Sequence, residues 1–271
     1  MNGGANMNRN IIFRIFKTAL KLTCAMALTN AAVSLYEQFL QMISEKRTLS
    51  YPWKYGRVSY TVKGTGSPIL LLHDLTPSAT GEDMAAIANH LATTHTVYTV
   101  DLPGYGFSEK PWLTYTNFVY VTFIRDFIKD VIGEPAGIYA RKGSCLIALQ
   151  AKHFLKDDVP SLVMIDPCYE EKISFPKDAA LKLQKVIEIP LYGTFIFHVY
   201  GFICGFPASK CCKHVFTALL TGHITTDISK YHHLIGSKVS VMQSTSIRSS
   251  MKDFLNPGEI WVSNGDTLTV K

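Results

Sequence analysis

The sequence predicts an α/β fold in which a mostly parallel sheet is covered by helices on both faces. Short apolar runs typical of strands alternate with segments of helical periodicity between residues 67 and 166. Several of these runs are apolar throughout, as expected of strands that are buried on both faces. Glycine and proline cluster where the runs end. The length of 271 residues suits one globular domain with an added N-terminal helix.

The first two strands are predicted at ILLLHDL (69–75) and at HTVYTVDLPGYGFSEKP (95–111), where the second run enters a Gly/Pro turn. Between them, GEDMAAIANHLATT (81–94) predicts a helix because its apolar residues recur at helical spacing. The residues with this spacing are Met84, Ile87, Ala88 and Leu91. Upstream, RVSYTVKGTG (57–66) alternates polar and apolar residues, which favours an antiparallel strand leading into the sheet.

The alternation continues with a helix predicted over residues 116–132 and a strand at GIYAR (137–141). A helix over residues 144–154 and a strand at SLVMIDP (161–167) follow. Strands that alternate with helices pair in parallel through right-handed crossovers. This order therefore predicts a sheet with its helices on both faces.

In their order along the chain, GSPILLLHDL, VYTVDLPGYGFSEKP, the segment around residues 140–144 and LVMIDP resemble the α/β-hydrolase superfamily. The resemblance covers residues 53–166, and GEIWVSNGD (258–266) resembles the strand that carries the family's acid. It implies an α/β-hydrolase-like domain over residues 51–271 with a helical cap at about residues 169–236. It also implies that the C-terminal end of the family's fold is missing, so that either the chain is truncated at Lys271 or its sheet ends early.

The family places its nucleophile in a strained turn between a strand and a helix, flanked by small residues. Aligning GIYAR with that strand puts Lys142 at the nucleophile position, with Ala140 and Gly143 beside it. A lysine amine at its ordinary pKa of roughly 10.4 is protonated and is not a nucleophile. The alternative register makes Ser144 the catalytic nucleophile, but it places larger residues at the small positions. This nucleophile elbow is degenerate by either alignment.

The oxyanion loop of the family corresponds here to His73, Asp74 and Leu75, where the usual His-Gly is replaced by His-Asp. If the carboxylate of Asp74 points inward, it opposes the stabilisation of a developing anion. If it points outward, it caps a helix or a turn. Both orientations are compatible with the sequence.

The resemblance implies that Asp266 is the catalytic acid, with Asp166 as the alternative. In the family's chain order a histidine follows the acid, whereas this sequence has no histidine after His233. The histidines between residues 169 and 236 show no ligand spacing, so we expect no metal and no cofactor. The aromatic run at residues 195–206 is explained either by an apolar pocket for acyl ligands or by packing alone.

The N-terminal 50 residues predict a basic and apolar helix followed by a linker at residues 44–53. Arg14, Lys17 and Lys21 share one helical face, and no charge follows until Glu37. A membrane anchor is the leading interpretation, with the hydrolase-like domain on the non-cytoplasmic side. A cleaved signal peptide, giving a secreted protein, and an interfacial or soluble packing helix are the alternatives.

Two functions from different classes follow from these observations. The favoured one is a membrane-associated hydrolase-fold protein with a degenerate catalytic site, which binds a small apolar or acyl ligand or a partner. The alternative is an active ester or acyl hydrolase with a non-standard triad. The six cysteines do not settle the compartment. The net charge of +6 is partly concentrated at the N-terminus, so it indicates an anionic membrane surface and not nucleic acid.

Overall fold

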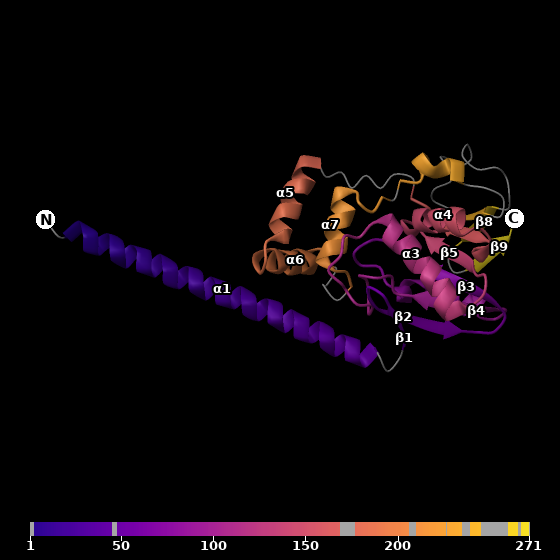
Figure 1. The fold of residues 1–271 in the computed structure, drawn as a ribbon, viewed down its shortest axis with the longest axis horizontal. Coiled ribbons are helices and arrows are strands. Elements are labelled where there is room, and N and C mark those ends of the chain that lie inside the picture. Colours follow the sequence, from indigo (N-terminus) through magenta and orange to yellow (C-terminus); the bar gives the residue numbers. More distant parts are fainter. Residues whose placement is uncertain are drawn as a thin grey trace.

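A computed structural model describes residues 3–44, 48–168, 177–205, 210–225, 227–234, 239–244, 260–264 and 267–270. Within these residues the chain forms one mixed sheet with the strand order β1-β2-β4-β3-β5-β6-β7-β8-β9 (Figure 1). The strands from β4 to β8 in that order are parallel, and antiparallel pairs close the sheet on both sides. The predicted α/β fold class is therefore confirmed.

Four strands lie on the runs predicted at residues 69–75, 95–111, 137–141 and 161–167, and in all the described residues form nine strands. They are β1 (Leu49–Trp53), β2 (Gly56–Lys63), β3 (Ser67–Leu72), β4 (His95–Val100), β5 (Gly137–Arg141), β6 (Leu162–Ile165), β7 (Val239–Ser244), β8 (Ile260–Asn264) and β9 (Thr267–Val270).

The helices comprise a long N-terminal helix, three helices of the sheet layers and three helices of the predicted cap. They are α1 (Gly3–Ser44), α2 (Ala85–Leu91), α3 (Asn117–Phe127), α4 (Ser144–Leu155), α5 (Lys177–Glu188), α6 (Tyr192–Ile203) and α7 (Lys213–Thr221). Short 3₁₀ turns precede α2, follow α4 and precede β7, and a π-helical turn extends α3 to Ile132.

Two hydrophobic cores form because β3 alternates its side chains between the two faces of the sheet. Leu70 and Leu72 pack with α3 and α4 in the larger core, whereas Ile69 and Leu71 pack with α2 in the smaller one. All four leucine and isoleucine side chains are buried. The sheet is thus covered on both faces, as the uninterrupted apolar runs predicted.

The predicted linker over residues 44–53 is wrong at its C-terminal end, because Leu49–Trp53 is strand β1 at the edge of the sheet. Tyr51 and Trp53 alternate with exposed residues and bury their rings against Phe127 and Phe123 of α3. Pro52 argues against a strand in the sequence because proline lacks a backbone N–H, but an edge strand tolerates a proline.

The turn after β4 depends on a glycine. Gly106 has φ +48, and a Cβ at this position would collide with the carboxylate of Asp101. That carboxylate is buried, and it accepts hydrogen bonds from the backbone nitrogens of Gly81 (2.6 Å) and Phe107 (2.8 Å). Asp101 therefore holds the turn after β4 against the segment before α2.

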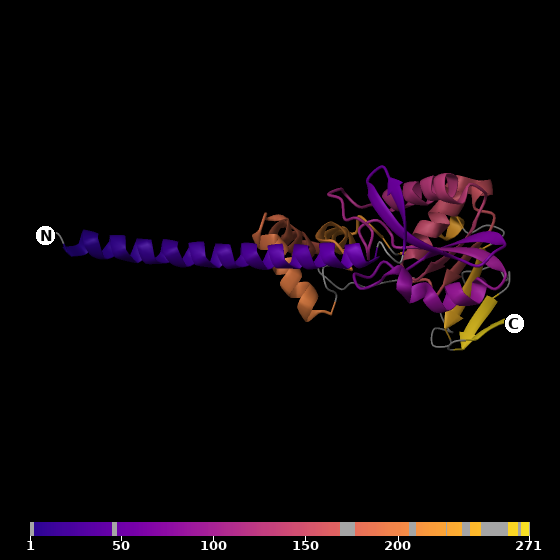
Figure 2. The same ribbon diagram turned by 90° about the horizontal axis from the view of Figure 1, so that it is seen from below.

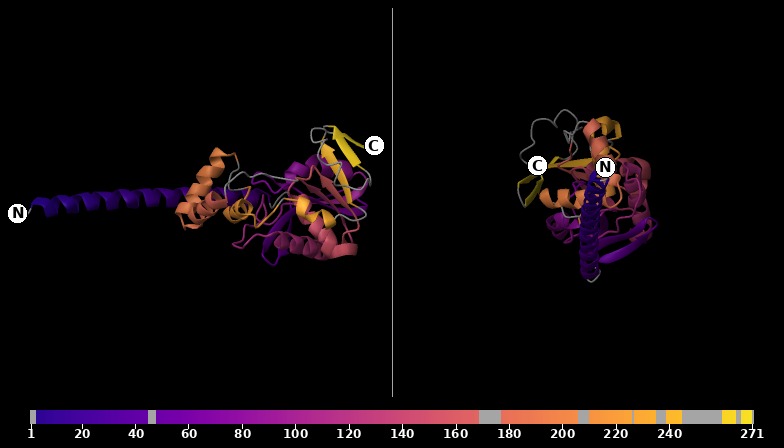
Figure 3. Two further views of the ribbon diagram at one scale, coloured as in Figure 1. Left: turned by 90° about the horizontal axis from the view of Figure 1, so that it is seen from above. Right: turned by 90° about the vertical axis from the view of Figure 1, so that its left-hand side faces the viewer.

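Helix α1 projects from one end of the molecule, and β9 lies at the other end (Figures 1 and 3). From below, α1 is seen to cross the cap helices (Figure 2). Within the described residues, no single helix has both the length and the apolar composition that a membrane span needs. By the same criteria α5 and α6 pass only as a pair, which is bent by 117°.

Candidate functional site

The strand-to-helix turn lies between β5 and α4, with Lys142 at its centre. Lys142 adopts φ +48, which is an uncommon conformation for a residue with a side chain. Its backbone nitrogen donates to the carbonyl of Ile165 at the end of β6 (2.8 Å). The Lys142 side chain is 44% exposed, whereas Gly143 and Ser144 after it are buried. An exposed position of this sharp turn therefore carries an amine.

Ser144 lies at the first position of α4 and is completely buried. Its hydroxyl is 2.9 Å from the carbonyl of Arg141 and 3.2 Å from the carbonyl of Leu72, and it accepts from the backbone nitrogen of Arg141 (3.1 Å). These contacts hold the turn to the ends of β5 and β3. In this geometry the hydroxyl forms hydrogen bonds with backbone groups and faces the protein interior.

The oxyanion loop follows β3, and its Asp74 points toward the elbow. The Oδ1 atom of Asp74 accepts from the backbone nitrogen of Gly143 (3.1 Å) and from that of Leu75 (2.7 Å). In α/β hydrolases the oxyanion hole consists of the amide after the nucleophile and an amide of this loop. The two donors at the corresponding positions here are both bound to the carboxylate of Asp74.

A second contact joins the same two segments. The Nζ atom of Lys142 lies 3.9 Å from Oδ2 of Asp74. The carboxylate is mostly buried, while the ammonium group reaches it from the solvent side. The sequence left the orientation of Asp74 open, and the structure places its carboxylate inward.

His73 is completely buried beneath this loop and fixes its path. The backbone nitrogen of Leu102 donates to Nε2 (3.0 Å), so the proton of a neutral ring resides on Nδ1, which lies 2.6 Å from the carbonyl of Asp74. Burial lowers the pKa of His73. Its ring also packs edge-on against Tyr105, whose hydroxyl donates to the carbonyl of Leu75 (2.7 Å). These contacts assign His73 a role in positioning the loop.

The structure describes only one of the two candidates for the catalytic acid. Asp266 lies outside the described residues. Asp166 immediately follows β6, and β6 pairs with β5 up to the elbow through Arg141 and Ile165. Asp166 also has a positive φ of +46. The structure thus brings the backbone of Asp166 close to that of Lys142.

Three cap histidines make side-chain contacts with α1, with α7 or with the loop before α3. His198 on α6 lies 3.1 Å from Oδ1 of Asn30, and His223 lies 2.6 Å from the hydroxyl of Thr221. His214 stacks on Trp112 with the ring centroids 5.4 Å apart. Burial lowers the pKa of His198 and His214, and Lys213 lowers both further.

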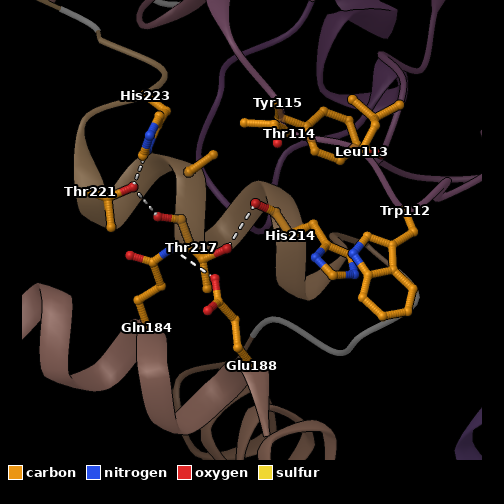
Figure 4. A pocket seen from close by; sticks show the side chains of 11 residues that line it. Trp112, Leu113, Thr114, Tyr115, Gln184, Glu188, His214, Thr217, Thr221 and His223 are labelled. Carbon is orange, nitrogen blue, oxygen red and sulfur yellow. Dashed lines mark hydrogen bonds between the residues drawn. The ribbon is translucent and has the colours of Figure 1, made fainter. Parts of the chain in front are cut away.

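A pocket of about 450 Å³ opens between α5, α7 and the loop before α3 (Figure 4). Glu188 and Gln184 reach into it from α5 and are joined by a hydrogen bond of 2.7 Å. The stacked rings of Trp112 and His214 form one side of it, and Thr217 of α7 another. These residues could not be predicted from the sequence, because polar side chains at separate positions on two helices and a loop carry no shared motif.

The pocket differs in character from the aromatic segment that the sequence singled out. Within residues 195–205, Phe197 is buried against Phe216, whereas Phe202 is exposed. Neither side chain lines this pocket. Packing and surface exposure thus account for these two aromatic residues.

Comparisons with known proteins agree with this architecture. The model of the alpha/beta hydrolase family matches residues 69–188. Among solved structures, an alpha/beta hydrolase fold protein from Burkholderia ambifaria has a TM-score of 0.54 at 17% identity, over 72% of this chain and 79% of that chain. An alpha/beta hydrolase enzyme from a Medee basin deep-sea metagenome has a TM-score of 0.54 at 15% identity, over 72% and 79% of the two chains. An esterase from Exiguobacterium antarcticum has a TM-score of 0.51 at 17% identity, over 70% and 76%.

No curated protein sequence matches the chain. At the identities given above, the likeness to solved structures shows the fold, which is that of the α/β hydrolases. Together with the family match over residues 69–188, it supports the α/β-hydrolase fold for this chain.

Proposed function

We propose that this chain is a non-catalytic member of the superfamily, which associates with membranes through α1 and binds a ligand or partner with its cap. The observation that carries the proposal is the carboxylate of Asp74, which is bound to the amides of Gly143 and Leu75. An acyl-transfer enzyme needs these donors for the negative charge that develops in its transition state. Here the side-chain oxygen of Asp74 already occupies both of them.

The residue at the apex of the elbow supports the same proposal. A hydrolase nucleophile must present a lone pair to the substrate. The amine of Lys142 is paired with the carboxylate of Asp74, and 3.9 Å separates its Nζ atom from Oδ2. Ser144, the other candidate, is buried, and its hydroxyl bonds to backbone carbonyls. Neither side chain is arranged for attack.

The membrane part of the proposal rests on α1. It is a helix of 42 residues, roughly 63 Å long at 1.5 Å per residue. Large apolar side chains are exposed along it, from Ile11 to Ile43. Such a surface is unusual unless it meets lipid or another protein. If α1 crossed the bilayer, its basic N-terminal residues would place the domain on the non-cytoplasmic side.

The ligand part rests on the cap pocket. Its volume lies within the range of small-molecule sites, and its aromatic pair and polar side chains converge from three elements. The polar groups of Glu188, Gln184 and Thr217 would need hydrogen-bonding partners on a ligand. They therefore favour a polar group on the ligand over an entirely apolar one.

A fluorophosphonate probe tests the absence of catalysis. The purified full chain is expected to stay unlabelled, while an active serine hydrolase added to the same tube is labelled. Stoichiometric labelling that is lost in Ser144→Ala would overturn the proposal and would support an active ester or acyl hydrolase instead.

A further inference from the structure

Helix α6 of the cap presents a large apolar surface to the outside. One side of the helix is buried at Gly193, Phe197 and Gly201, which are spaced by four residues. At its C-terminal end Phe202 is 87% exposed and Ile203 is 75% exposed. Apolar side chains of this size rarely gather on the surface of a soluble monomer without a partner.

Helix α1 packs against α6 with a defined face. The half-buried positions of α1 recur at intervals of three and four residues, so they form one stripe along the helix. This stripe consists of Thr23, Met26, Asn30, Val33, Glu37 and Leu40. Polar residues alternate with apolar ones along it, and most of the large apolar side chains of α1 lie elsewhere on the helix.

Hydrogen bonds fix the stripe to the cap. The side-chain nitrogen of Asn30 donates to the carbonyl of Leu191 (2.9 Å), and its oxygen lies 3.1 Å from Nδ1 of His198. The hydroxyls of Thr23 and Tyr192 lie 2.9 Å apart. Helix α1 is therefore docked on α6 through the middle of its uncharged stretch, residues 22–36.

The opposite face of α1 combines apolar and basic side chains. Positions 14, 21, 28, 35 and 42 recur every seven residues and so share one face. They carry Arg14, Lys21, Leu28, Leu35 and Met42. The three apolar members are exposed. No acidic residue occurs between residues 3 and 36. This pattern of apolar and basic groups matches a bilayer with anionic lipids.

The docking of Asn30 also restricts how the helix can meet the membrane. If residues 22–36 crossed the bilayer, Asn30 and the cap groups bonded to it would lie within the hydrocarbon. Those cap groups belong to a folded layer that also carries exposed charged residues, such as Lys182 and Lys185 of α5, which the hydrocarbon excludes. A helix that lies in the interface keeps these hydrogen bonds and still buries its apolar side chains.

We propose that α1 and α6 together form one membrane-docking surface, which rests on the interface of anionic bilayers without crossing them. This inference deepens the membrane association proposed above and depends on it. Helix α1 supplies the basic and apolar face, and α6 supplies Phe202 and Ile203 as a second insertion point. The cap is then the part of the domain nearest the lipid.

Co-sedimentation of the full chain with vesicles tests this surface. The vesicles contain phosphatidylcholine alone or phosphatidylcholine with phosphatidylglycerol. The unaltered chain is expected to prefer the anionic vesicles and to be released from them by alkaline carbonate. The double variant Phe202→Ser/Ile203→Ser should bind the anionic vesicles at least about tenfold more weakly, because it loses two inserting side chains. Phe118→Ser is the matched control because Phe118 is an exposed phenylalanine on α3, and it should bind like the unaltered chain.

The remaining outcomes separate the two proposals. If the unaltered chain binds neither kind of vesicle, the membrane part of the proposed function fails. If it binds and the α6 variant binds equally well, only the present inference fails. Retention after carbonate would show that α1 spans the bilayer, and this also overturns the inference. The inference is also overturned if light scattering finds a dimer of the unaltered chain and a monomer of the α6 variant. The surface would then join two copies of this chain.

Discussion

The carboxylate of Asp74 and the backbone amide of Gly143 are 69 residues apart in the sequence and are joined by a hydrogen bond of 3.1 Å. The bond connects the loop after β3 with the turn before α4. The same oxygen accepts from Leu75 at 2.7 Å. Two strand ends of the sheet are thereby held by one side chain, and the strength of this connection can be measured.

Asp74→Ala should lower the free energy of unfolding by about 2 kcal/mol, because two buried amide donors lose their acceptor. Asp74→Asn keeps a side-chain oxygen at the same place, and it should cost less than about 1 kcal/mol. Urea unfolding of both variants at pH 7 measures the difference. Equal losses in the two variants would contradict the assignment of Oδ1 as the acceptor of both amides.

Lys142→Ser places a hydroxyl at the apex of the elbow, yet it should not create a site that reacts with fluorophosphonates. The donors that would stabilise the developing charge stay bound to Asp74 in this variant. Intact-mass spectrometry after incubation with the probe measures the labelled fraction. Rapid, stoichiometric modification of the new serine would show that Asp74 does not block the site.

His73 should make the stability of the protein fall in mild acid. Burial lowers the pKa of His73 in the folded state, so the unfolded state binds the proton more readily. The stabilisation is complete above the unfolded pKa of about 6.5, and it is lost as the pH falls below that value, by at most about 1.4 kcal/mol per pH unit.

Urea titrations between pH 7.5 and pH 5 test this expectation, with His73→Gln as the comparison. The variant should have a shallower dependence of stability on pH. It should not be flat, because burial also lowers the pKa of His198 and His214. Identical slopes would mean that His73 does not titrate differently in the folded and unfolded states.

Gly106→Ala should destabilise the protein by about 3 kcal/mol or more, because the added Cβ collides with the Asp101 carboxylate in a left-handed conformation. Gly133→Ala is a matched control with φ +78 and no atom within 4 Å of the added Cβ. It should cost only about 1 kcal/mol. Thermal unfolding compares the two, and similar losses would show that backbone conformation alone accounts for the effect.

The fold was largely predictable, because strands buried on both faces have an apolar composition that is visible locally. The strand Gly137–Arg141 and the start of the following helix at Ser144 agree with the prediction. Strand β1 was missed because its burial depends on packing against α3 and because Pro52 is a poor strand former. Likewise, β7 and β9 were not anticipated from the sequence.

The candidate site was less predictable. Lys142 was placed in the turn from the pattern of small and apolar neighbours, which is local information. The direction of Asp74 depends on the amide of Gly143, which only the folded sheet brings near it. The pocket likewise could not be predicted, because only the fold brings Trp112 of a loop next to His214 of a helix that is distant in the sequence.

The pairing of Asn30 with the cap has a mechanical consequence. About 27 residues of α1 precede Asn30, and they form a rigid arm of roughly 40 Å. An arm that is bonded to Leu191 and His198 transmits torque to α6 when its far end is displaced. Helix α5 packs against both α6 and α7. A tilt of α1 that moves α6 would therefore change the shape of the pocket between Glu188 and Thr217.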